Sequence, residues 1–244
     1  MKKLILISAL LVIAACSDND NDNDPVPPPV TPPVTDPPPP APANASYEIS
    51  AVNLTVGQPF SPLALLIHDE SQTAFEIGTA ASAGLEQLAE GGDNSQFLAD
   101  LDSVAETSGA APIAPGGNET ISLELDSDDP TGLRLTVMTM LVNTNDAITG
   151  VNGANIGELA VGESITFNTI SYDSGTEANT ELGVEIPGPI SGGEGFNAAR
   201  DDIRDEVMMH QGVVTADDGL ASSDLGQQHR WDNPVARFQI TRTQ

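Results

Sequence analysis

The feature that most limits how this chain folds is a proline-rich segment near its N-terminus. Residues 25–43 hold 11 prolines in 19 positions, and residues 18–24 alternate between aspartate and asparagine. Such sequence favours extended polyproline II and offers too few apolar side chains for a core, so we predict a disordered linker over residues 16–46. A globular fold must therefore come from residues 47–244, a length that suits one domain.

The first 16 residues carry the pattern of a bacterial lipoprotein signal. A basic start precedes an apolar run at 4–12, which is shorter than the roughly 20 residues that a membrane-spanning helix needs. Small residues then lead to Cys16, the only cysteine. We predict a signal peptide over residues 1–15 and lipidation of Cys16, with a plain signal peptide as the alternative. Ser17 after the cysteine favours an outer-membrane anchor, with the domain facing the periplasm or the cell surface.

The charge of the mature chain excludes two classes of partner. Both lysines belong to the signal peptide, which leaves six arginines against 36 acidic residues and a formal charge of −30. Such a surface repels nucleic acid and anionic lipid head groups, whereas cations are its natural counter-species. Adaptation to salt is the simplest explanation for most of these acidic residues.

Alternating apolar and polar residues indicate a mainly β domain. The predicted strands are 47–56, 120–126, 133–142, 164–172 and 234–241. Helical spacing of apolar residues predicts short helices at 80–89 and 95–101, with 197–209 as a third candidate. Strands joined by short helical insertions predict an antiparallel β-sandwich.

Enzyme chemistry finds little support in the sequence. There is no Gly-x-Ser-x-Gly motif, no HExxH zinc motif, and His68, His210 and His229 are too far apart to define a triad. His68 with Asp69 is either an acid–base pair or, as we expect, a loop histidine near a strand end. Arg230-Trp231 is either packing of the single tryptophan, which we expect, or a ligand platform.

Calcium binding fits two acidic loops better, because this ion prefers several carboxylate and carbonyl oxygens held on loops. One loop, at 143–146, ends in Asp146, and the other, at 173–177, contains Asp173, Gly175 and Glu177. If the strands that precede these loops run in the same direction, the three carboxylates converge at one end of the sandwich. The alternative is a pair of ordinary solvent-exposed loops.

Several motifs in order resemble the N-terminal spondin domain of F-spondin and mindin, and especially its bacterial relatives. They are QPFSP at 58–62 with His68, FEIG at 75–78, ASAGL at 81–85, LAEGG at 88–92, MLVNTNDA at 140–147, YDSGTEAN at 172–179 and NPVAR at 233–237. The resemblance implies an antiparallel β-sandwich, similar to calcium-dependent membrane-binding modules, with calcium at one end and no catalytic activity. The family's acidic ligands fall on Asp146, Asp173 and Glu177. Animal members more often have aspartate at the last position. Glu181 matches no ligand and is expected to be a solvated acid.

We therefore expect a lipid-anchored cell-envelope protein that binds calcium and serves adhesion or the binding of an extracellular protein or glycan. The animal members' additional cysteines and repeats are absent, so their partners are not carried over. One alternative is a secreted hydrolase with Asp173 and Glu177 as paired carboxylates. Only one tryptophan and two tyrosines are available as sugar platforms, which disfavours it. Another is a purely structural envelope protein.

Overall fold

The structure is a computed structural model, and it describes residues 43–200 and 204–244. The predicted signal peptide, Cys16 and the linker up to residue 42 lie outside the described residues. In the part of the chain that the structure describes, no helix combines the length and apolar character that crossing a membrane requires.

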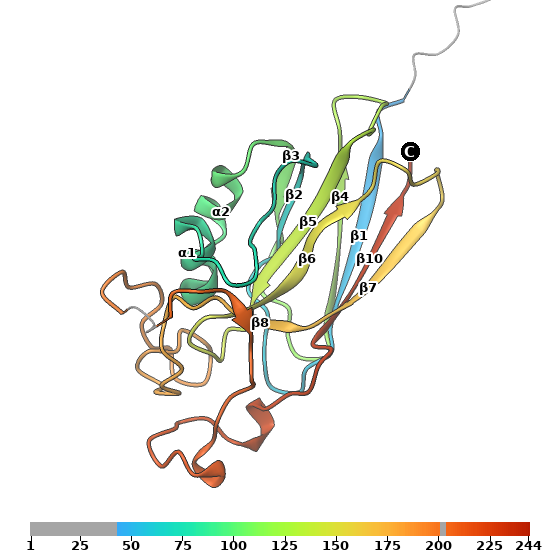
Figure 1. Cartoon of the computed structure of the whole chain (residues 1–244). Helices are drawn as coiled ribbons and strands as arrows, with labels where there is room; N and C mark the ends of the chain where they lie inside the picture. Colours follow the sequence, from blue (N-terminus) through green and yellow to red (C-terminus); the bar gives the residue numbers. More distant parts are fainter. Residues whose placement is uncertain (1–42, 201–203) are drawn as a thin grey trace, which may run out of the picture. The chain divides into compact units, whose positions relative to one another are not determined.

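The domain consists of two antiparallel sheets with helices on one side (Figure 1). The four-stranded sheet has the order β4-β1-β10-β7, formed by β1 (Ser46–Asn53), β4 (Asn118–Glu124), β7 (Ser164–Thr169) and β10 (Ala236–Arg242). The six-stranded sheet has the order β3-β2-β5-β6-β8-β9, formed by β2 (Ala64–Asp69), β3 (Ser103–Ser108), β5 (Leu133–Met140), β6 (Ala147–Asn155), β8 (Ser171–Asp173) and β9 (Met208–Met209). The predicted mainly β, antiparallel sandwich is confirmed.

The six-stranded sheet is covered on both faces, which explains the apolar sequence of β5. Leu135 and Val137 of this strand belong to the core between the two sheets. Met138 belongs to a second core, which it shares with the helix residues Leu88 and Phe97. A strand buried on both faces has no solvent side, so polar alternation disappears from its sequence.

Two short helices, α1 (Ala83–Gly91) and α2 (Ser95–Asp100), form the outer layer. The Ser82 hydroxyl accepts a hydrogen bond from the backbone N–H of Leu85 and caps α1, while Gly92 ends it in the left-handed conformation with φ 69°. The predictions at 80–89 and 95–101 are therefore confirmed within a few residues. In α2 the N-cap position is taken by Asn94 rather than Ser95, and the Asn94 side chain makes no capping hydrogen bond.

Two other predictions are corrected by the structure. The third candidate helix at 197–209 was wrong, because its described residues form a turn and then β9, which pairs with the edge of β8. The single strand predicted at 164–172 is two strands. Thr169 pairs with β10 in one sheet and Ser171 pairs with β6 in the other, so the chain changes sheets at Ile170.

The two ends of the sandwich carry different features. Strand β1 begins beside the end of β10, where Tyr47 pairs with Arg242. At the other end, the turn after β1 contacts the loop after β5, since the Gln58 side chain donates to the carbonyl of Asn143 at 3.2 Å. The acidic loops thus lie opposite the end at which β1 begins.

Candidate metal centre

The two predicted acidic loops meet because of strand direction. Strands β5 and β8 are both antiparallel to β6, so they run in the same direction and their C-terminal loops emerge at the same end. The loops are joined directly, since the Ser174 N–H donates to the Asp146 carbonyl at 3.3 Å. The strands that precede the two loops thus run in the same direction, which is the condition that the sequence left open.

Asp146 is fully buried, and its two carboxylate oxygens have different surroundings. Its Oδ2 accepts from the Ser174 hydroxyl at 3.0 Å and from the backbone N–H groups of Thr176 at 3.0 Å and Glu177 at 3.3 Å. Its Oδ1 has no hydrogen-bond partner among the described residues. The opposite loop therefore holds one oxygen in place and leaves the other available to a ligand.

Asp173 is partly buried, and its carboxylate is held by its own loop. Its Oδ1 accepts from the Gly175 N–H at 3.0 Å and its Oδ2 from the Asn179 side chain at 2.6 Å. Gly175 has φ 70°, and a side chain there would overlap the backbone of Glu206. Glycine is thus required for the turn that follows Asp173.

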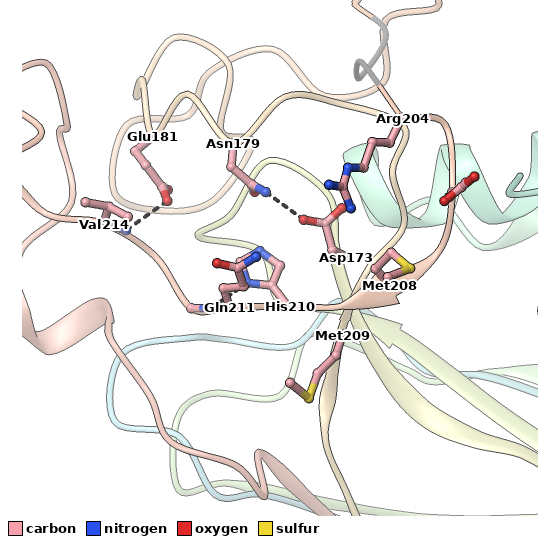
Figure 2. A pocket seen from close by; sticks show the side chains of 11 residues that line it. Asp173, Asn179, Glu181, Arg204, Met208, Met209, His210, Gln211 and Val214 are labelled. Atoms are coloured by element: carbon pink, nitrogen blue, oxygen red, sulfur yellow. Dashed lines mark hydrogen bonds between the residues drawn. The ribbon is translucent and has the colours of Figure 1, made fainter. Parts of the chain in front are cut away.

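His210 completes a cluster that the sequence did not predict. It follows β9, its N–H donates to the Ser171 carbonyl at 3.1 Å, and its side chain is only 3% exposed. One oxygen of Asp146, one oxygen of Asp173 and one ring nitrogen of His210 all lie within 4.8 Å of one another. Figure 2 shows Asp173 and His210 in the pocket of about 430 Å³ that they line. Three metal-ligating side chains from three segments thus converge.

The electrostatics of this cluster favour a cation. Burial raises the pKa of the Asp146 carboxyl, and the neighbouring charge of Asp173 raises it further. Burial lowers the pKa of the His210 ring, against the opposing effect of Asp173. Two carboxylates and a neutral imidazole share a poorly solvated space, so an added positive charge would relieve their repulsion.

Glu177, the third predicted ligand, is engaged elsewhere. Its Oε1 pairs with the Arg200 guanidinium at 2.8 Å and accepts from the Asn145 side chain at 3.1 Å. Burial raises the Glu177 pKa to about 8 although Asn145 and Arg200 oppose this rise. Glu90 of α1 belongs to the same group of buried acidic residues, and burial raises its pKa to about 7. With a pKa of about 8, the Glu177 carboxyl forms a full ion pair with Arg200, 2.8 Å away, only in alkaline solution.

Glu181 is not a solvated acid, and that prediction was wrong. Its side chain is 1% exposed, and its Oε1 accepts from the Val214 N–H at 3.0 Å. Burial raises its pKa to about 7. The segment around Val214, 33 residues further along the chain, shields the Glu181 side chain from solvent. The residues next to Glu181 in the sequence do not predict this burial.

The remaining candidates take structural positions. His68 lies within β2 and is fully buried, with Nε2 2.9 Å from the Thr136 hydroxyl, so the expectation of a loop histidine was wrong. The Asp69 carboxylate instead accepts from the Ser71 N–H. Trp231 packs against the core and its N–H donates to the Ser171 hydroxyl at 2.9 Å, which supports the packing interpretation.

Sequence reasoning missed His210 and Arg200 as members of the site. Both lie in the segment that was considered as a possible helix or follow it directly. The only local signal is the apolar pair Met208-Met209 next to His210, which is compatible with a short edge strand. Such a signal does not say which strand it pairs with.

Fold and site together define a β-sandwich with two aspartates and a histidine, residue types that metal ions bind, close together at one end. The comparison with protein families agrees: the Spondin_N family model matches residues 53–183, more than half of the 244 residues. The chain belongs to the spondin N-terminal domain family. This is not a known enzyme family, and membership indicates an extracellular or cell-surface domain. No curated protein matches the chain. Asp146, Asp173 and Glu177 lie inside the matched region, and His210 lies outside it.

Proposed function

We propose that the chain is a lipid-anchored cell-envelope protein whose spondin domain binds calcium at the end of the sandwich and acts in adhesion or in binding an extracellular protein or glycan. One observation carries the proposal. The buried Asp146 Oδ1 lacks a hydrogen-bond partner within the described residues, and one oxygen of Asp146 lies within 4.8 Å of an oxygen of Asp173. Buried charged oxygens are normally satisfied, so an unpartnered one beside a second carboxylate suits a cation.

The residues fit calcium through the two aspartates. Calcium takes six to eight oxygen ligands at about 2.3–2.6 Å, and it commonly fills part of this shell with water. Asp146 and Asp173 supply the charged oxygens, and the adjoining pocket of about 430 Å³ gives water access. Glu177 would add its carboxylate only after leaving Arg200.

The consequence of binding would be to lock two loops together. Asp146 belongs to the loop between β5 and β6, and Asp173 ends β8. An ion held by both carboxylates neutralises their repulsion and fixes the loops that form this end of the domain. A partner that contacts this end would then meet an ordered surface only when the ion is present.

Calorimetric titration of the purified full-length chain in nonionic detergent tests the site. We expect calcium binding with a Kd of about 10⁻⁴–10⁻³ M, the range of extracellular modules. Asp146→Asn keeps an oxygen for the N–H groups that now bind Oδ2, and Asp173→Asn is its equivalent on the other loop. Both variants should lose measurable binding. The exposed Asp126→Asn is the matched control and should bind as the wild type does.

Equal calcium binding by the wild type, Asp146→Asn and Asp173→Asn would refute the assignment of the site. The anchor is tested separately, by mass spectrometry of the mature N-terminus and by Cys16→Ser, which should release the chain from the membrane fraction. Protease treatment of intact cells then distinguishes a surface-facing from a periplasmic domain.

A further inference from the structure

The histidine in the cluster sets this site apart from one built only of oxygen ligands. His210 comes from outside the region that matches the family. Its Nδ1 accepts the Gly212 N–H at 2.9 Å, while its Nε2 is buried and has no partner in residues 43–200 and 204–244. Two residues of the cluster, His210 and Asp146, thus each have a buried ligand atom without a partner in the described residues.

We propose that His210 takes the place of Glu177 as the third protein ligand, and that the resulting site selects a first-row transition metal ion such as zinc over calcium. The inference rests on the proposed function, since it takes Asp146 and Asp173 as the other two ligands. It changes the identity of the preferred ion and the residue that determines it.

The position of Glu177 supports this replacement. Its carboxylate is held by the Arg200 guanidinium at 2.8 Å and by Asn145 at 3.1 Å. Moving it away from Arg200 would break the shorter of the two contacts that this partly buried guanidinium makes with acidic side chains, since the other, with Glu194, is 4.0 Å long. His210 requires no ion pair to be broken, so it is the ligand that is available.

The donor set supports the choice of metal. Calcium and magnesium prefer oxygen ligands, whereas imidazole nitrogen favours zinc and its neighbours in the first transition row. Two aspartates, one histidine and a water molecule from the adjoining pocket complete the four-coordinate shell that zinc adopts most often. The Asp146 Oδ2 and its three hydrogen bonds supply the outer contacts that fix a ligand's orientation.

Binding through Nε2 requires one local adjustment. The Gly212 N–H donates to Nδ1 of His210, so the proton of the neutral ring lies on Nε2. A neutral ring that gives Nε2 to a metal carries its proton on Nδ1 instead, and the Gly212 N–H must then turn away. Gly212 has φ 91°, and a Cβ at this residue would meet no atom within 4 Å, so no neighbouring atom crowds the backbone on that side.

Competition between Zn²⁺ and Ca²⁺ for the full-length chain in detergent tests the inference. We expect the wild type to bind Zn²⁺ at least about 100-fold more tightly than Ca²⁺. His210→Asn keeps an acceptor for the Gly212 N–H but removes Nε2, and it should weaken Zn²⁺ binding at least about 100-fold. Calcium binding should change by less than about threefold, because calcium does not depend on the nitrogen.

Two further variants secure the assignment. His229→Asn is the matched control, since His229 is also buried and its Nδ1 also accepts a backbone N–H, from Gly226 at 2.9 Å. It should bind Zn²⁺ as the wild type does. His210→Gln places an amide oxygen near the position of Nε2 and should shift the preference towards Ca²⁺, which guards against a folding defect in His210→Asn.

An optical signal reports on the same site. Trp231 is the only tryptophan, and its ring lies 5.2 Å from the ring of His210. Stoichiometric Co²⁺ should quench its fluorescence in the wild type and in His229→Asn, but not in His210→Asn.

The outcomes separate this inference from the proposed function. If Asp146→Asn and Asp173→Asn lose both ions while His210→Asn binds Zn²⁺ like the wild type, the aspartate site stands and the role of His210 is refuted. If Glu177→Gln weakens Zn²⁺ as strongly as His210→Asn, the replacement of Glu177 is refuted. If the aspartate variants bind both ions normally, the proposed function fails as well.

Discussion

Glu181 offers a direct test of how burial controls the stability of this domain. Its carboxyl group is 1% exposed and its pKa rises from 4.5 to about 7, with desolvation as the cause. An acid whose pKa is higher in the folded than in the unfolded state binds more protons when folded. Its contribution to the free energy of unfolding is therefore largest below pH 4.5 and is lost as the pH rises to about 7. At 1.36 kcal/mol per pKa unit, the loss is about 3 kcal/mol.

Glu181→Gln removes this titration and keeps a side-chain oxygen for the Val214 N–H. The free energy of unfolding of the variant minus that of the wild type should be about 3 kcal/mol larger at pH 8 than at pH 4. For a domain of this size, this corresponds to roughly 6–12 °C in Tm. Urea unfolding followed by Trp231 fluorescence at both pH values measures it. The exposed Glu158→Gln serves as the control and should show the wild-type pH dependence. A constant difference between Glu181→Gln and the wild type at both pH values would refute the argument.

Two further predictions concern the residues around the candidate site. Arg200→Met leaves the buried Glu177 without its cation and should lower the free energy of unfolding by about 1–2 kcal/mol at pH 9, above the Glu177 pKa of about 8. The loss in urea unfolding should be smaller at pH 5, where Glu177 is protonated, and an equal loss at both values would contradict this. Gly175→Ala forces φ 70° on a residue whose side chain would overlap Glu206, so its Tm and calcium affinity should both fall. Gly162→Ala, with φ 86° but open space around it, should cost only about 1 kcal/mol and leave calcium binding intact, and similar behaviour of the two alanine variants would count against a steric role for Gly175.

The sequence predicts some strands of the sandwich and misses others, among them β2, β3 and β6. Alternation places β1 and β4 correctly, and the long apolar run places β5. Strand β6 was missed because its sequence, AITGVNGAN, contains two glycines. One of them, Gly150, lies so close to β5 that any side chain would overlap the backbone of Val137. Gly150 therefore weakens the strand pattern in the sequence, although the close packing of β6 on β5 requires glycine at this position.

The candidate site also contains residues that the sequence predicted and residues that it did not. Asp146 and Asp173 follow strands that run in the same direction, so their approach was predictable once that direction was assumed. The partners that decide the rest come from sequence far away: Arg200 beside Glu177, and His210 beside Asp173. An acidic residue in a polar loop has the same sequence pattern whether its carboxylate faces water, pairs with an arginine or is buried under a later segment. Only the tertiary structure distinguishes these cases.

The place of the first strand has a mechanical consequence. Strand β1 lies inside its sheet, with seven residue pairs to β4 on one side and seven to β10 on the other. A load between the start of β1 and the loops at the opposite end acts along the strand, across hydrogen bonds that lie perpendicular to it. Both ladders are then sheared together, whereas an edge strand would be peeled away one bond at a time. Since forced unfolding is governed by the unfolding rate, this arrangement gives the domain a resistance to pulling that its equilibrium stability does not measure.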